Sequence, residues 1–259
     1  MAKPKVLVFS GYGLNCEEET KFAFDLAGGR ADIMHINDLI EKPKELTNYQ
    51  ILAIPGGFAY GDDTGSGNAF ANKLRNHLQK EIFDFVVKDK LVIGICNGFQ
   101  ILVNLGLFGK VALLHNTNAR YTVRWVDLKI ANKSPWLLGI ETISLPIAHG
   151  EGRFFAAEKV LKKLEEKKQI AAKYIRGEIC NYQFLSPNPN GSLEDIAAIT
   201  DESARVFGIM PHPERAIFFT QLPHWTYLKE KYQREGKKLP KFAPGLTIFK
   251  NAINFFKKL

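Results

Sequence analysis

The 259-residue sequence has few cysteines and no long uninterrupted apolar run. Its three cysteines are an odd number without paired spacing, which argues against a disulfide framework and favours a reducing compartment. No segment approaches the roughly 18 consecutive apolar residues that a membrane helix requires. The first residues lead into an expected strand rather than into the apolar stretch of a secretion signal. We therefore expect a cytoplasmic protein that does not contact a membrane.

Two further absences concern ligands. The sequence has no zinc-type spacing of cysteine and histidine and no Gly-x-x-x-x-Gly-Lys-[Ser/Thr] phosphate loop, so we expect neither a metal ion nor a cofactor in this chain. The formal net charge of +8 could indicate a nucleic-acid partner. However, many lysines lie among acids at helical spacing, as in residues 159–168, and no aromatic RNA-binding signature accompanies them. We interpret them as solvated helix faces and expect no nucleic-acid binding.

Short apolar runs alternate with helical patterns in the first half of the chain. This alternation predicts an α/β fold with one doubly wound, mostly parallel sheet and helices on both faces, with strands at 5–9, 33–36, 50–54 and 91–95 and a long helix at about 68–88. Asn15 is placed to cap the first helix. Alternating runs in the second half predict antiparallel strands, added to this sheet or folded beside it, at 121–126, 142–147, 170–175 and 196–200.

We expect a single domain over residues 1–259. Residues 218–242 are polar, basic and aromatic without a clean period, and we interpret them as an inserted loop. Residues 246–259 have the amphipathic pattern of a terminal helix.

The most informative segment of the chain surrounds Cys96. A buried-type strand ends at this residue, a helical pattern follows at once, and Gly94 and Gly98 lie two residues to either side. Gly-x-Cys-x-Gly between a strand and a helix is typical of a nucleophile elbow, with sulfur where esterases carry a hydroxyl. The start of the following helix favours a thiolate. The alternative is a buried core cysteine, because free cysteine packs as a small hydrophobe.

A base for that thiol is found after another buried-type strand, at residues 206–210. The strand leads into Pro-His-Pro-Glu, which places His212 and Glu214 two positions apart at a strand's carboxyl end. The histidine could take a proton from a thiol, and the glutamate could orient the imidazole. Alone, His-Pro-Glu is more typical of a surface turn with a solvated histidine and glutamate. Together with the elbow it predicts a Cys-His-Glu triad.

An oxyanion site is also needed for attack on a carbonyl. The third strand ends in Pro-Gly-Gly-Phe, a bend that exposes backbone N–H groups. The amides of Gly57 and Asn97 could together bind a developing oxyanion. An ordinary strand-to-helix turn, which also uses glycine, is the alternative interpretation of the bend.

With these residues in place, the sequence resembles the class I, or triad, glutamine amidotransferases, whose fold is flavodoxin-like. It is similar in detail to the family of glutaminase subunits of phosphoribosylformylglycinamidine synthase. The similarity recurs along most of the chain, at residues 14–16, 55–62, 94–100, 116–121, 124–126, 148–154 and 211–215. Residues 218–242 match no part of the family's motifs.

The resemblance implies a role for each candidate residue. Cys96 would be the nucleophile, His212 the general base and acid, and Glu214 the residue that orients the histidine. Gly57 and Asn97 match the positions of the oxyanion donors.

The resemblance also implies a glutamine-binding set. Gln100, one helical turn beyond the cysteine, matches a position that contacts the bound glutamine. His149, Gly150 and Glu151 belong to a segment whose backbone holds the amino-acid end of the substrate. Glu151 could instead pair with Arg153 or face a partner. Cys16, at another helix start, has no base motif beside it, and we interpret it as structural.

The resemblance implies L-glutamine as the substrate and purine biosynthesis as the pathway. Ammonia would pass to a separate ATP-dependent synthetase of the PurL type, with a small PurS-type subunit, and ATP and magnesium would be bound by that partner. One rival is a glutaminase subunit for another acceptor, such as a pyridoxal phosphate or GMP synthase. The other is a non-catalytic sensor with an oxidisable elbow cysteine.

Overall fold

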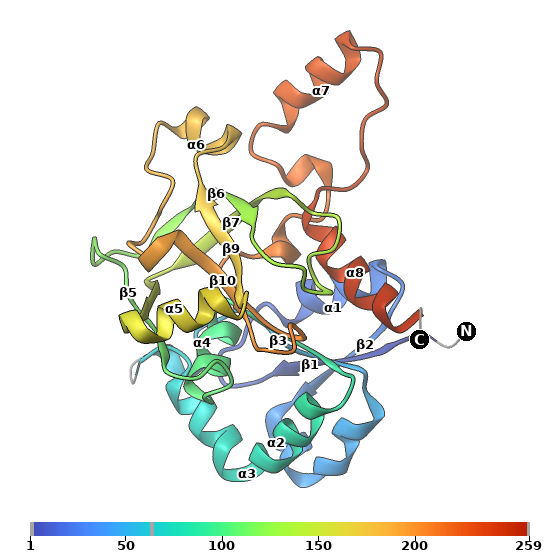
Figure 1. Ribbon diagram of the computed structural model, residues 1–259. Helices are drawn as coiled ribbons and strands as arrows, with labels where there is room; N and C mark the ends of the chain where they lie inside the picture. Colours follow the sequence, from blue (N-terminus) through green and yellow to red (C-terminus); the bar gives the residue numbers. More distant parts are fainter. Residues whose placement is uncertain (1–2, 63–64, 258–259) are drawn as a thin grey trace.

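The computed structural model describes residues 3–62 and 65–257. Within these ranges the main feature is a nine-stranded sheet with the order β2-β1-β3-β4-β11-β10-β9-β6-β7 (Figure 1). The first five strands in this order are parallel to one another, and each of the remaining four is antiparallel to its neighbour. The prediction of a mostly parallel α/β sheet with added antiparallel strands is confirmed.

The parallel half contains the most apolar segments of the chain. Every residue of β3, β4 and β11 is buried, as expected for strands covered on both faces. The parallel strands are β1 (Lys5–Ser10), β2 (Arg30–His35), β3 (Ile51–Ile54), β4 (Leu91–Ile95) and β11 (Val206–Ile209). Since parallel strands place their carboxyl ends at one edge, the segments that follow β1, β3, β4 and β11 gather there.

The antiparallel strands fall into two groups. Four extend the main sheet: β6 (Thr122–Ile130), β7 (Thr142–His149), β9 (Ile170–Ile175) and β10 (Ile196–Thr200). Two form a separate ladder, β5 (Val111–His115) and β8 (Glu151–Ala156). All four predicted antiparallel strands therefore extend the main sheet, and the two strands of the separate ladder were not predicted.

Helices cover both faces of the sheet. Strand β2 lies on one side of β1, whereas β3 and β4 lie on the other side. Because the connections between parallel strands are right-handed, this change of direction places α1 (Glu17–Leu26) and α3 (Asn68–Val87) on opposite faces. The terminal helix α8 (Gly245–Lys257) packs beside α1, where the rings of Phe24 and Phe249 lie 4.9 Å apart, and α4 (Asn97–Asn104) packs beside α3. The other α-helices are α2 (Ile36–Glu41), α5 (Glu158–Glu166), α6 (Glu178–Gln183) and α7 (Trp225–Arg234).

Short 3₁₀ segments complete the structure: η1 (Pro43–Asn48), η2 (Ala59–Asp62), η3 (Leu193–Asp195), η4 (Pro213–Arg215) and η5 (Phe219–Gln221). None of the helices in the described ranges is both long and apolar enough to cross a bilayer.

Two local expectations require correction. The N-cap of α1 is Cys16 rather than Asn15, and its side chain makes no capping hydrogen bond. Residues 218–242, expected as a loop, contain η5 and α7. Phe218 and Phe242 close this stretch at its base by an antiparallel bridge, and in Figure 1 α7 projects away from the sheet. The helix was missed because none of its residues is fully buried and its apolar positions, Trp225, Leu228 and Tyr232, are few among polar and charged residues.

Candidate active site

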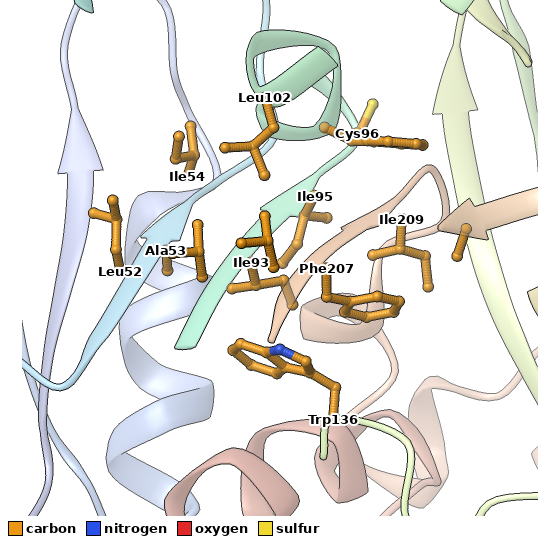
Figure 2. Packing of buried hydrophobic residues seen from close by; sticks show 14 of the residues in the cluster. Leu52, Ala53, Ile54, Ile93, Ile95, Cys96, Leu102, Trp136, Phe207 and Ile209 are labelled. Atoms are coloured by element: carbon orange, nitrogen blue, oxygen red, sulfur yellow. The ribbon is translucent and has the colours of Figure 1, made fainter. Parts of the chain in front are cut away.

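Cys96 lies at the sharp turn between β4 and α4 (Figure 2). Its backbone has φ 50° and ψ −105°, a conformation unfavourable for a residue with a side chain. The flanking glycines make the turn possible. A Cβ added to Gly98 would lie 1.9 Å from the carbonyl oxygen of Ile54, and one added to Gly94 would lie 2.5 Å from the carbonyl oxygen of Gly98. The nucleophile elbow predicted from the sequence is thus present as a backbone conformation.

Strand pairing brings the elbow to the second predicted motif. Strand β11 runs parallel to β4 with Ile209 beside Ile95, and the amide of Cys96 donates to the carbonyl of Ile209 at 2.8 Å. His212 follows three residues after Ile209 and is fixed in turn, since its amide donates to the carbonyl of Pro146 at 2.8 Å. Two segments more than a hundred residues apart in sequence therefore end at one site.

His212 and Glu214 form a buried pair. The imidazole Nδ1 and the Glu214 Oε1 lie 2.5 Å apart, and each residue is 2% exposed. Burial lowers the pKa of His212, but the Glu214 carboxylate and the nearby Cys96 and Cys16 sulfurs outweigh it and raise that pKa well above its ordinary value. A protonated imidazole held by a carboxylate is suited to donate a proton to a leaving group.

The Cys96 sulfur interacts electrostatically with His212 and also donates a hydrogen bond to the carbonyl of Ala148 at 3.7 Å. The hydroxyl of Tyr121 donates to the same carbonyl at 2.9 Å. Among the described residues, Nε2 of His212 has no hydrogen-bond partner. The nitrogen that a triad would direct at the thiol thus makes no close hydrogen bond to these residues, although the Cys96 and Cys16 sulfurs lie near enough to raise the pKa of the ring. Long catalytic hydrogen bonds of this kind are common before substrate binds.

The two amides predicted as oxyanion donors belong to Gly57 and Asn97. Gly57 and Leu14 form an isolated antiparallel bridge. The hydrogen bonds of this bridge are donated by the amides of Asn15 and Phe58, so the amide of Gly57 takes no part in the pairing. Asn97 is the first residue of α4, where backbone N–H groups have no partner within the helix.

Gln100 is held by neighbouring residues. Its Oε1 accepts from the Asn97 side chain at 2.8 Å, its Nε2 donates to the carbonyl of Glu151, and the residue is 5% exposed. The Glu151 carboxylate accepts from the amide of Ser66 at 3.1 Å and lies 3.4 Å from His115. The structure thus brings Gln100 and Glu151 together, and the contacts of Glu151 are with Ser66 and His115 rather than with Arg153.

His149 and Gly150 lie where β7 turns into β8. His149 is buried, and burial followed by the charge of His212 lowers its pKa to about 3. Its Nδ1 lies 3.2 Å from Oδ1 of Asn116, whose side-chain amide donates to the carbonyl of His149 at 2.9 Å. The backbone amide of Asn116 donates to the carbonyl of Gly150 at 2.8 Å. This organising role of Asn116 was not predicted, because an isolated asparagine carries no sequence signal for it.

Sequence reasoning also missed two neighbours of the His-Glu pair. Arg215 Nη2 donates to the sulfur of Cys16 at 2.9 Å. Ligand atoms of Cys16, His212 and Glu214 all lie within 4.8 Å of one another. Cys16, interpreted as structural, is therefore part of this site.

The fold and the elbow-histidine-glutamate arrangement are those of a glutamine amidotransferase, and comparison with known proteins agrees. The family model described as a CobB/CobQ-like glutamine amidotransferase domain matches residues 3–256, and the chain belongs to this family. Among its similar curated proteins are subunits of phosphoribosylformylglycinamidine synthase. One of them, a Methanococcus maripaludis protein named phosphoribosylformylglycinamidine synthase subunit PurQ, is 49% identical, with 98% of each chain covered.

Solved structures give the same result. A chain in the structure of PurLQS from Thermotoga maritima is 30% identical with a TM-score of 0.75, covering 98% of this chain and 99% of that one. A putative GMP synthase subunit from Thermoplasma acidophilum has a TM-score of 0.57 at 12% identity, covering 100% of this chain and 96% of that one, and shows the shared fold alone.

Proposed function

We propose that this chain is the glutaminase subunit of phosphoribosylformylglycinamidine synthase, hydrolysing glutamine to glutamate and ammonia for purine biosynthesis. The observation that carries the proposal is the buried His212–Glu214 pair beside the elbow sulfur of Cys96. The full-length similarity to PurQ subunits specifies the acceptor enzyme.

The reaction begins with attack of the Cys96 thiolate on the side-chain amide carbon of glutamine. The protonated His212 beside it and the N-terminus of α4 both favour the thiolate. The amides of Gly57 and Asn97 stabilise the oxyanion, and loss of one such donor commonly costs about 3 kcal/mol of transition-state stabilisation. His212 then donates its proton to the departing nitrogen, which leaves ammonia and a γ-glutamyl thioester.

Water completes the cycle. His212, now neutral, accepts a proton from the water molecule that attacks the thioester, and Glu214 stabilises the imidazolium that results. Cleavage of the carbon–sulfur bond releases glutamate and restores the thiolate. Gln100, His149, Gly150 and Glu151 hold the substrate in this proposal, with Asn116 and Asn97 fixing their positions.

Ammonia released into bulk water would be protonated and lost, so the chain works with an acceptor. The partners are a PurL-type synthetase and a PurS-type small subunit, in keeping with the PurLQS assembly of the Thermotoga relative. We assign ATP and magnesium to the synthetase, and we place the complex in the cytoplasm.

The test compares Cys96→Ala with Cys180→Ala in the reconstituted complex. Cys180 is a matched control, since it is another buried cysteine but lies on α6, where its thiol donates to the carbonyl of Leu185 at 2.8 Å. Cys96→Ala should lose glutamine-dependent synthesis by at least about a thousandfold while ammonia-dependent synthesis continues. Cys180→Ala should retain both activities.

Persistent glutamine hydrolysis by Cys96→Ala would contradict the assignment of the nucleophile. Transfer of ammonia to a GMP or pyridoxal phosphate synthase, but not to the PurL-type enzyme, would instead contradict the assignment of the acceptor.

A further inference from the structure

Cys16 lies against the catalytic pair although it is far from it in sequence. It begins α1 and is 1% exposed, and its amide donates to the carbonyl of Gly56 at 3.1 Å. A Cβ added to Gly56 would lie 2.7 Å from Cε1 of His212 and 3.4 Å from the sulfur of Cys16. The sulfur, the glycine and the imidazole are thus packed with no space for another group.

Besides its interaction with the His212 imidazole, the sulfur of Cys16 has two polar contacts. Its thiol donates to Oδ1 of Asn15 at 3.5 Å, and the sulfur accepts from the Arg215 guanidinium at 2.9 Å. Arg215 also approaches Glu214, but its Nε stays 3.9 Å from Oε1, beyond hydrogen-bonding distance. Arg215 therefore contacts the sulfur more closely than it contacts the carboxylate.

The Glu214 carboxylate is left available to His212. Its Oε1 is bonded to the imidazole, and its Oε2 is buried without a hydrogen-bond partner among the described residues. A guanidinium normally binds both oxygens of a nearby carboxylate side by side. Arg215 does not do so here, and its bond to the Cys16 sulfur accounts for the difference.

A metal ion is the alternative occupant, because atoms of Cys16, His212 and Glu214 have the mutual spacing of metal ligands. Two observations oppose it. The His212 nitrogen and the Glu214 oxygen are bonded to each other at 2.5 Å, and the positive guanidinium already binds the sulfur.

We propose that Cys16 is a positioning residue for the glutaminase reaction, which holds Arg215 at ion-pair distance from Glu214 without a hydrogen bond, so that the carboxylate forms its hydrogen bond with His212. This inference rests on the proposed function and deepens it. Without the sulfur, Arg215 would move onto the unpartnered Glu214 Oε2 and neutralise part of its charge. The imidazolium of His212 would lose stabilisation and would deprotonate at lower pH.

The test measures pH profiles of glutamine hydrolysis in the reconstituted complex for Cys16→Ala, Cys16→Ser and Cys180→Ala. Loss of the imidazolium sets the alkaline limb of the profile. Cys16→Ala should move that limb about one pH unit lower and reduce kcat about tenfold above it, with KM little changed. Cys16→Ser, which can still accept from Arg215, should remain near the wild-type profile, and Cys180→Ala should match it.

A double variant tests the cause. In an Arg215→Gln background no cation competes for Glu214, so adding Cys16→Ala should shift the limb less than it does with Arg215 present, by only what the direct contact of Cys16 with His212 contributes. Titration of His212 by NMR in the full chain provides a readout that does not depend on turnover, and it should show the same shift.

An unchanged alkaline limb and His212 titration in Cys16→Ala would overturn the inference, as would an equal shift in the Arg215→Gln background. If Cys16→Ala does not fold, the Arg215→Gln variant provides the test. Removing a competing cation should not lower the pKa of His212, so a His212 titration moved to lower pH in Arg215→Gln would also overturn the inference. Failure of the proposed function is a separate result, namely glutaminase turnover by Cys96→Ala.

Discussion

The strained backbone at Cys96 leads to a specific stability prediction. Replacing Cys96 with glycine should give a more stable protein than replacing it with alanine. Both changes remove the sulfur, so the comparison isolates the effect of a Cβ atom at φ 50° and ψ −105°. At ordinary positions the order is the reverse, because glycine loses more conformational entropy on folding.

The magnitude follows from two opposing terms. A residue with a side chain in such a region costs about 1–3 kcal/mol, which glycine avoids. The larger conformational entropy that glycine loses on folding offsets about 0.5–1 kcal/mol of this gain in stability. Cys96→Gly should therefore exceed Cys96→Ala by about 1 kcal/mol, which corresponds to about 2–4 °C in Tm for a chain of this size.

The assay is thermal and denaturant unfolding of both variants, with Ala27→Gly as the control. Ala27 has the ordinary helical values φ −72° and ψ −9°, so its change to glycine should lower the free energy of unfolding by about 0.5–1 kcal/mol. If Cys96→Ala were as stable as Cys96→Gly while the control behaved normally, the elbow would not be strained and the reasoning would fail.

Three further predictions concern the glycine under the elbow and the two buried histidines. The Cβ of Gly98→Ala would lie 1.9 Å from the Ile54 carbonyl oxygen, so this change should lower the free energy of unfolding by about 3 kcal/mol. Gly109→Ala has nothing within 4 Å and should lower it by about 1 kcal/mol, because Gly109 has a positive φ. Equal losses in denaturant titrations would refute the steric account. Because burial lowers the pKa of His149 to about 3, the unfolded chain binds an extra proton below pH 6.5. Acidification from neutral pH to pH 4.5 should therefore lower the free energy of unfolding by about 2.5 kcal/mol, a loss that a His149→Gln variant avoids. Parallel stability curves for the two proteins would contradict this. In Glu214→Gln no carboxylate opposes the effect of burial on His212, so the pKa of His212 should fall. The alkaline limb of the hydrolysis profile should then move to lower pH, with at least about a tenfold loss of kcat. An unmoved limb would exclude the orienting role of Glu214.

The parts of the site that could be predicted are those whose signal lies within a few residues. The turn at Cys96 needs glycines two positions to either side and a strand before a helix, and all of these are adjacent in sequence. The proximity of His212 to Glu214 is likewise local, because the two residues are separated by one proline. Hydrophobic periodicity predicted β9 and β10 with the bounds observed.

Other features could not be predicted because they depend on contacts between distant segments. Arg215 and Cys16 are 199 positions apart, and no spacing rule connects them. Cys16 was interpreted as structural because no base follows it in sequence, although it packs against a base from another strand. Helix α7 was missed for a related reason, since its partly buried residues pack in a small cluster separate from the main core, with Phe219, Leu222, Ala243 and Trp125.

Local sequence was sufficient for the chemistry of this protein: a sulfur on a tight turn, an imidazole beside a carboxylate, and strands suited to a parallel sheet. Strand order alone established that these pieces meet, because β4 and β11 become neighbours through pairing that no local signal encodes. The same long-range packing placed the Arg215 guanidinium closer to Cys16 than to Glu214. The electrostatic environment of His212 is thus a property of the folded chain, since burial and charge arise only when remote segments exclude water together.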